Sequence, residues 1–436
     1  MKLSKKQMLL VSFMLFSLFF GAGNLIFPPF LGQNAGTNWP LAISTFLITA
    51  VALPVMGVIA VAEFDGLDKL ASKVHPLFAG VFTVLIYLSI GPGLGIPRAT
   101  SVPFEMAVAP YLPKESSLKL FMLLYSAVFF ITATWLALTP SKLVQRIGKF
   151  LTPSLLCLIV FLFISFLLKG HTAVAAPTGE YIKSAAVFGF LEGYNTMDAI
   201  AALNFGLVIA TTIKSLGISD KKQVMSYTVK AGLAAGSILS LIYLVISYLG
   251  MATSGLYPIQ DNGAWVLRCI VYDLFKETGA ILLAAIFTLA CLTTCVGLIT
   301  SISQYFSGFL KRVSYRQLVF FISTFSFLVC NLGLNTILSI SVPVLNMIYP
   351  VAIVLIVLGI LNKYINDNPY IFPFVTRATA FVSIIYSLEK MHINVPLLSQ
   401  SLHYLPFYKL GMGWVVVALV MAACAIVYHK LTKTQQ

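Results

Sequence analysis

Charged residues are scarce in this sequence. They make up 10% of its 436 residues, whereas 59% of the residues are hydrophobic. Because soluble domains carry about 25% charged residues, this composition excludes a water-soluble globular protein. A helix that crosses a bilayer needs about 20 apolar residues, so the chain can form about a dozen spans and has no room for a large soluble domain. We expect a single membrane domain over residues 1–436.

Acidic residues are the rarer of the two charged classes. The 14 Asp and Glu stand against 28 Lys and Arg, which gives a net charge of +14. In a soluble protein this excess would suggest a nucleic-acid partner. When the N-terminus is placed in the cytoplasm, however, most of the basic residues fall in cytoplasmic loops, as the positive-inside rule predicts. We therefore expect both termini in the cytoplasm, lipid around the protein and no nucleic-acid partner.

Cysteine and histidine are also few. The six cysteines contain no C-x-x-C pair, so neither a disulfide framework nor a zinc site is indicated. The five histidines show no H-x-x-x-H spacing, so the usual ligands of a membrane metalloenzyme are lacking. Nothing in the sequence resembles the filter repeat of a channel. We expect a transporter and not an enzyme, with a membrane-embedded enzyme or a channel as the alternatives.

The sequence is dominated instead by long stretches without charge. Twelve of these stretches suffice for a crossing when residues 184–191 are joined to residues 199–213. None alternates apolar and polar residues in the way that a membrane barrel requires. The sequence therefore predicts an all-α membrane protein with twelve transmembrane helices.

Two of the predicted helices contain interruptions. In the first, Gly21, Gly23 and Asn24 lie near the middle of the span, where the alternative to a break is close packing at a glycine. In the sixth, polar residues from Glu192 to Asp198 separate two short apolar halves, and the alternative is a surface loop that caps two helices. Unwound backbone at membrane depth is tolerated only where it faces protein, water or a ligand, so each break predicts a binding site.

The two interrupted helices are five spans apart. An odd number of crossings inverts the direction of the chain, and paired breaks in two halves are typical of inverted-repeat transporters. We predict one repeat over about 7–168 and a second over about 184–361. Two appended helices would follow, at about 371–388 and 410–428.

Three motifs carry a resemblance to a known family. They are GAGNLIFPPFLGQNAG from Gly21, GPGLGIPRAT from Gly91 and EGYNTMDAIAAL from Glu192. The chain resembles the branched-chain amino-acid carriers, which are cation symporters for leucine, isoleucine and valine. The resemblance implies the LeuT-type five-plus-five fold, symport with sodium and a place in a bacterial cytoplasmic membrane. The alternative is symport with protons, of the same or other small apolar amino acids. It implies no organic cofactor and no obligate protein partner.

The broken helices provide a candidate substrate site. If the first helix runs outward, its outer half begins with free amides near Gly23 and Asn24, which would attract the substrate carboxylate. Carbonyls around the break in the sixth helix would accept from the ammonium. The predicted substrate-binding residues are Ala22, Gly23, Asn24, Phe190, Leu191, Glu192 and Gly193.

A sodium site is implied by the resemblance. In LeuT-like sodium carriers, a small residue and two hydroxyl residues on the eighth helix face the first helix across an ion. Ala290, Thr293 and Thr294 match that pattern, with the carbonyls of Ser17 and Phe20 opposite. Neutral oxygens suit a hard cation, although the threonines could instead bond to their own helix. A second ion at Asn24 and the number of ions stay open.

Besides Glu192, and Arg377 on an appended helix, three ionisable residues fall within or near the membrane: Arg98, Glu105 and Asp198. Such residues are costly in a membrane and are functional candidates by default. Arg98 and Glu105 could equally form a structural pair two turns apart on one helix, so the sequence leaves the roles of all three open.

Overall fold

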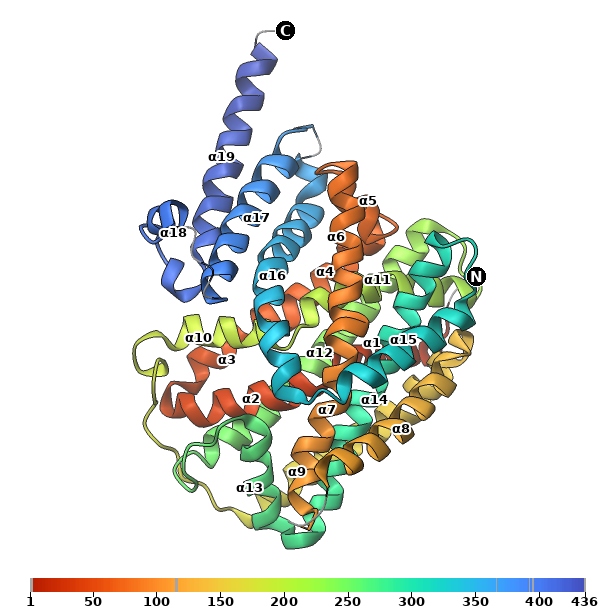
Figure 1. Cartoon of the computed structure of the whole chain (residues 1–436), viewed down its shortest axis with the longest axis vertical. Helices are drawn as coiled ribbons and strands as arrows, with labels where there is room; N and C mark the ends of the chain where they lie inside the picture. Colours follow the sequence, from red (N-terminus) through yellow and green to blue (C-terminus); the bar gives the residue numbers. More distant parts are fainter. Residues whose placement is uncertain (1–2, 114–116, 366, 392, 394–395, 435–436) are drawn as a thin grey trace.

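The protein is a bundle of α-helices (Figure 1). The computed structural model describes residues 3–113, 117–365, 367–391, 393 and 396–434, and these contain no strand. Within them, ten helical segments are long and apolar enough to cross a membrane. The expectation of an all-α membrane protein is therefore confirmed for the described part of the chain.

The α-helices are α1 (Lys5–Phe19), α2 (Ala22–Ala35), α3 (Trp39–Leu47), α4 (Leu53–Glu63), α5 (Leu67–Ser72), α6 (Pro76–Leu88), α7 (Gly95–Ala107), α8 (Leu118–Ala137), α9 (Thr152–Lys169), α10 (Tyr181–Asn195), α11 (Asp198–Ser215), α12 (Lys221–Ala252), α13 (Gly263–Phe275), α14 (Gly279–Phe309), α15 (Tyr315–Cys330), α16 (Leu334–Ile365), α17 (Ile371–Lys390), α18 (Pro396–Leu402) and α19 (Gly413–Thr434). Single turns of 3-10 helix lie at Gly36–Asn38, Ala109–Tyr111, Pro140–Lys142, Lys276–Thr278 and Tyr408–Leu410. Wider π-helical segments lie at Ile48–Ala52, Ser89–Gly93 and Val144–Leu151.

The broken first helix is held at the centre of the bundle by close packing. Its second half, α2, lies along α12, and a Cβ atom added to Gly32 of α2 would come within 2.8 Å of the Met251 nitrogen on α12. Small residues allow such a close approach between helix backbones in membrane proteins. The two halves of the other broken helix also have partners, because α10 lies along α3 and α11 lies along α4. Helix α1 packs against α12 as well, so all four half-helices are fixed by neighbours.

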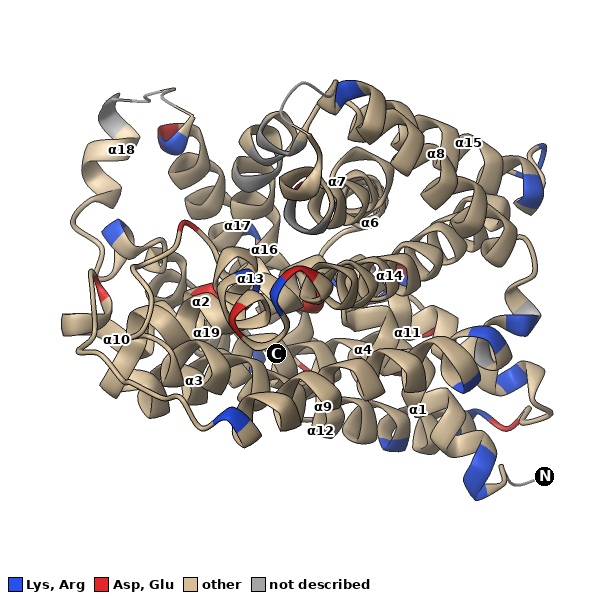
Figure 2. Ribbon diagram, turned by 90° about the horizontal axis from the view of Figure 1, so that it is seen from below, with Lys and Arg blue, Asp and Glu red and all other residues tan. Residues whose placement is uncertain are grey.

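The last helices lie at one end of the molecule. Helix α17 packs between α16 and α19, and α19 projects beyond the rest of the bundle (Figure 1). Only 6% of the apolar stretch in α19 is buried inside the protein, which leaves most of that helix for lipid. Figure 2 shows most of the Lys and Arg residues at the rim of the molecule, in loops and at helix ends.

Candidate functional site

Four helix ends meet at one small cavity. Helix α1 ends at Phe19 and α2 begins at Ala22, while α10 ends at Asn195 and α11 begins at Asp198. The cavity measures about 50 Å³, and both breaks line it, together with side chains of α7 and α14. Helix ends expose backbone groups with no partner in their own helix, so polar atoms of both kinds converge here.

The break between α1 and α2 follows from the side chain of Asn24. Its Oδ1 accepts a hydrogen bond from the Gly21 amide at 2.9 Å, where a continuous helix would direct that amide to the Ser17 carbonyl. The Ser17 carbonyl accepts instead from the hydroxyls of Thr293 and Thr294, at 3.1 and 3.2 Å. The predicted interruption of the first helix is confirmed.

Most of the predicted sodium ligands come together at this point. Ser17 and both threonines are in contact, and the Thr293 hydroxyl also donates to the Ala290 carbonyl at 2.9 Å. A Cβ atom added to Gly21 would lie 3.0 Å from the Thr294 hydroxyl oxygen, so the backbone beyond Phe20 passes beside the pair. The donor atoms are neutral oxygens at the partially negative end of α1. Such a set fits a hard monovalent cation.

The start of α2 carries partial positive charge, opposite to the partial negative charge at the end of α1. The amides of Ala22, Gly23 and Asn24 have no acceptor among the described residues, and the dipole of α2 adds partial positive charge there. All three residues line the cavity, as the sequence predicts for a substrate site.

A buried network joins α2, α11 and α12 next to these amides. Asn24 Nδ2 donates to Asp198 Oδ2 at 2.6 Å and to the Tyr243 hydroxyl, which itself donates to the same carboxylate oxygen at 2.7 Å. None of the three residues is more than 2% exposed. The carboxylate lies in the first turn of α11, where the helix dipole favours a negative charge. Asp198 is therefore a site residue whose role the sequence left open.

The break in the second interrupted helix lies at the end of the predicted polar segment, which runs from Glu192 to Asp198. Thr196 and Met197 separate α10 from α11, and Met197 adopts a left-handed conformation with φ of 68°. The polar residues before them continue α10: Asn195 Nδ2 donates to Glu192 Oε2 at 3.2 Å, and Gly193 packs against the Phe46 carbonyl. The predicted interruption is therefore confirmed, but it occupies Thr196 and Met197 and not Glu192 to Asn195.

This shift also changes the expected backbone contacts of α10. Phe190, Leu191, Glu192 and Gly193 all lie within the helix, and the Phe190 carbonyl accepts from the Thr49 hydroxyl at 2.8 Å. The prediction that these carbonyls are freed by a break is wrong, and those of Asn195 and Thr196 occupy that place. None of the four predicted α10 residues lines the small cavity.

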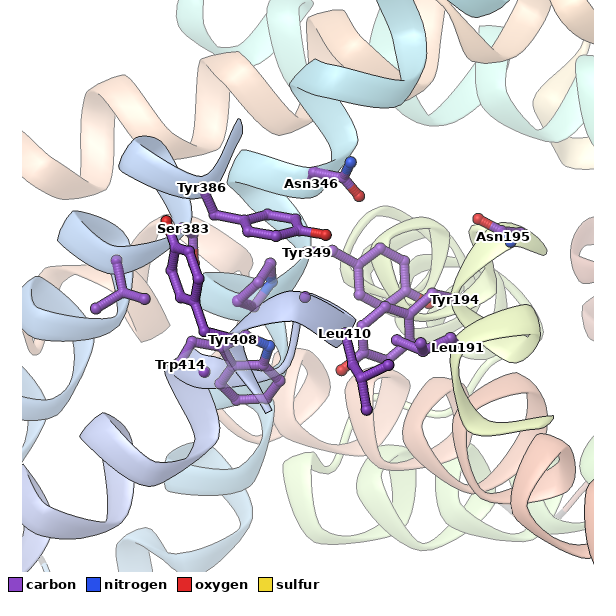
Figure 3. A pocket seen from close by; sticks show the side chains of 14 residues that line it. Leu191, Tyr194, Asn195, Asn346, Tyr349, Ser383, Tyr386, Tyr408, Leu410 and Trp414 are labelled. Carbon is purple, nitrogen blue, oxygen red and sulfur yellow. The ribbon is translucent and has the colours of Figure 1, made fainter. Parts of the chain in front are cut away.

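Leu191 instead lines a second, larger cavity of about 190 Å³ (Figure 3). Side chains of α10, α16 and α17 and of the segment leading into α19 enclose it. Tyr194 stacks on Tyr349 with ring centroids 4.5 Å apart, so two stacked aromatic rings line this cavity between α10 and α16. Adjacent residues at the end of α10 line the two cavities, Asn195 the larger and Thr196 the smaller.

Arg98 of α7 completes the small cavity. Its Nη2 donates to the Asn195 carbonyl at 3.2 Å, its Nη1 lies 3.0 Å from the Met197 sulfur, and the guanidinium sits 5.8 Å from the centre of the Phe27 ring. The residue is 8% exposed, and none of the ion pairs in the described part of the chain includes it. The alternative of an Arg98–Glu105 pair is thus not what the structure shows for the guanidinium.

Comparisons with known proteins agree with this architecture. A family model described as "Branched-chain amino acid transport protein" matches residues 4–432. The chain is 40% identical over 425 residues to "Branched-chain amino acid permease BraB" of Bacillus subtilis, covering 97% of this chain and 95% of that protein. It is 38% identical over 428 residues to the "Branched-chain amino acid transport system 2 carrier protein" of Pseudomonas aeruginosa, covering 98% and 96%.

A solved structure supports the fold. MhsT in complex with L-phenylalanine matches 99% of this chain and 98% of its own, with a TM-score of 0.56 and 18% identity. At that identity the match concerns the fold alone, and it confirms a LeuT-like helical architecture. The relatives are named as permeases and carriers, so the protein is a multi-pass membrane transporter rather than an enzyme. From the match over nearly its whole length, the chain belongs to the branched-chain amino acid transport protein family.

Proposed function

We propose that this protein imports leucine, isoleucine and valine by symport with sodium. One observation carries the proposal: two interrupted helices meet at a single cavity, with a cluster of neutral oxygens beside it. Transporters with inverted repeats place substrate and coupling ions at such paired breaks. The names of the relatives supply the class of substrate.

The topology that we propose has twelve spans. The first five, from α1–α2 to α9, and the next five, from α10–α11 to α16, form inverted repeats, with α17 and α19 appended. The paired breaks support this division, because each occurs in the first helix of its repeat. The distribution of lysine and arginine supports cytoplasmic termini in a bacterial inner membrane.

The substrate would lie across the small cavity. Its carboxylate would meet the free amides at the start of α2, and its ammonium would meet the carbonyl oxygens at the end of α10 and the carboxylate of Asp198. The cavity of about 50 Å³ is small, so the side chain needs additional space. Outward movement of α7 or α11 would provide it, since alternating access moves one bundle against the other.

Sodium would lie between α1 and α14. The two threonine hydroxyls would turn their oxygen lone pairs toward the ion and give up their bonds to the Ser17 carbonyl, which would become a ligand itself. The carbonyls of Phe20 and Ala290 would complete the site. An ion that ties the broken helix to α14 would favour one conformation and raise substrate affinity, and the coupling must act in both directions.

Proton coupling is the second candidate, and Asp198 favours it. A buried carboxylate that bonds to the other broken helix through Asn24 could take up a proton when that contact changes. The two mechanisms differ in the ion that drives uptake, so they predict different results in the same vesicles.

Transport by purified protein in liposomes tests the proposal. Labelled leucine should accumulate when sodium is present outside, and unlabelled isoleucine or valine should drive counterflow. Vesicles with potassium on both sides and an imposed proton gradient serve as the comparison. Accumulation in those vesicles alone would overturn sodium coupling in favour of protons, and no uptake of any branched-chain amino acid under either gradient would overturn the proposed function.

A further inference from the structure

Arg98 carries a buried charge that forms no direct ion pair in the described part of the chain, although Asp198 lines the same cavity. A guanidinium has five N–H donors. In this structure one donates to a backbone carbonyl and another points at a thioether sulfur, which is a weak acceptor. A buried charge is costly unless it is paired and hydrogen-bonded. Arg98 therefore has donors left over inside the cavity, where a bound anion would accept hydrogen bonds from them.

The position of the guanidinium identifies where such an anion would bind. A Cβ atom added to Gly23 would lie 3.0 Å from Arg98 Nη2, so the guanidinium stands directly over the first turn of α2. The same turn presents the free amides of Ala22, Gly23 and Asn24. An anion held by these amides is within reach of Arg98, and both kinds of donor line the one cavity.

We propose that Arg98 binds the carboxylate of the transported amino acid. The inference rests on the proposed function and specifies its substrate class: small molecules that carry both a free carboxylate and a free ammonium. The cavity is lined by one guanidinium and by the carboxylate of Asp198, so a zwitterion matches its charges. An amine without a carboxylate offers the guanidinium no anionic acceptor of its own.

Binding in this way also connects the substrate to the second broken helix. In the structure, Arg98 caps the end of α10 through the Asn195 carbonyl. A bidentate bond to a carboxylate uses the donors of the guanidinium fork. Arg98 would then exchange its bond to Asn195 for the substrate and release the end of α10 where it joins α11. Arg98 is thus a binding residue whose partner changes with occupancy.

Leucinamide separates this role from a purely structural cap, because it keeps the ammonium and side chain of leucine and lacks the carboxylate. We expect the wild type to bind leucine much more tightly than leucinamide. In Arg98→Gln, leucine affinity should fall by about ten- to a hundredfold, as for the loss of a hydrogen bond to a charged group, while leucinamide affinity should stay nearly constant. The ratio of the two affinities should therefore collapse.

Arg146→Gln is the matched control. Arg146 also donates to the last carbonyls of a helix, those of Trp135 and Leu136 at the end of α8, and it does not line the cavity. Ligand-dependent thermal stabilisation of purified protein measures both affinities without requiring transport. Arg98→Lys keeps the positive charge and loses the two-pronged donor geometry of the guanidinium. It should therefore lower the ratio of leucine to leucinamide affinity by less than Arg98→Gln does, and it replaces Arg98→Gln in the test if that variant does not fold.

Equal losses for leucine and leucinamide in Arg98→Gln would overturn the proposal and reduce Arg98 to a cap of α10. An unchanged ratio in both Arg98 variants would overturn it as well. If the wild type takes up leucine with protons in place of sodium, the proposed sodium coupling is wrong. The ratio of leucine to leucinamide affinity then still decides whether Arg98 binds the carboxylate. A wild type that binds no branched-chain amino acid would contradict both proposals.

Discussion

Removing the paired hydroxyls of Thr293 and Thr294 should steeply raise the sodium concentration that half-maximal uptake requires. Valine keeps the branched shape of threonine and lacks its oxygen, so Thr293→Val with Thr294→Val deletes two ligands with little change in volume. The hydroxyls now bond to the Ser17 carbonyl at 3.1 and 3.2 Å, so both are within reach of one ion beside that carbonyl. Threonines on adjacent positions of a helix differ by about 100° in direction, and the broken helix provides the remaining oxygens.

The size of the effect can be worked out from these contacts. If each hydroxyl stabilises the ion as much as a hydrogen bond to a charged group does, the pair contributes about 3–6 kcal/mol. Each 1.4 kcal/mol is tenfold in a binding constant, so half-maximal uptake should require at least about a hundredfold more sodium. The lost bonds to Ser17 cost about 1 kcal/mol each in stability, which lowers the amount of folded protein and leaves the half-saturating concentration unaffected.

The assay is initial leucine uptake into proteoliposomes over a range of sodium concentrations, with choline keeping the ionic strength constant. Thr300→Val is the control, because this buried threonine lies two turns further along α14 and away from the break in the first helix. It should retain the wild-type sodium curve. If the double variant also retains that curve, the ion does not lie between α1 and α14.

Two further predictions concern the site and the surface. Gly23→Ala should lower uptake about 5- to 100-fold at normal expression, because its Cβ atom would lie 3.0 Å from Arg98 Nη2 and 3.1 Å from the backbone at position 196, and overpacking costs about 1–3 kcal/mol. The control is Gly80→Ala, which adds a methyl group with no neighbour within 4 Å. Equal uptake by the two variants would contradict the placement of α2. The Lys221 ammonium donates to Asp65 at 2.7 Å and holds the pKa of that carboxyl below its ordinary 3.8. Because the pKa is lowered in the folded state, the pair should stabilise the protein at neutral pH, and this stabilisation should be lost as the pH falls below 3.8. The difference in melting temperature between wild type and Lys221→Gln should therefore shrink toward acid, and it should be small throughout because both side chains are exposed.

The break in the first helix could be predicted from the sequence, because its signal is local. Two glycines and an asparagine within four residues interrupt an apolar run, and the asparagine side chain performs the capping that its position indicates. The threonine pair on α14 is predicted only by its likeness to the pattern of sodium carriers. Its contact with Ser17 depends on the packing of two helices far apart in sequence, which periodicity does not specify.

The second break occupies only the end of the predicted polar segment, because polarity is an incomplete guide to helix ends. Glu192 and Asn195 are polar, but they are spaced three residues apart and bond to each other along one helix face. The helix ends where the backbone of Met197 turns left-handed, and methionine carries no signal for that conformation. Tertiary contacts impose the turn, since Arg98 fixes the carbonyl on one side of it and Asn24 fixes the carboxylate on the other.

The same limit explains why Tyr243 escaped notice. It lies in the middle of a long apolar helix, where a tyrosine has no distinguishing neighbours in sequence. Its hydroxyl becomes significant only because α12 packs along α2 and brings it to the carboxylate of Asp198. A buried acid that follows a break is itself a signal that partners must exist, because an unpaired carboxylate at that depth would be too costly. Asp198 therefore predicts donors from neighbouring helices, and the fold supplies them from Asn24 and Tyr243. Since these donors come from α2 and α12, any movement of the broken helices relative to α12 must rearrange the bonds to this carboxylate, which places Asp198 where substrate, ion and conformation can affect one another.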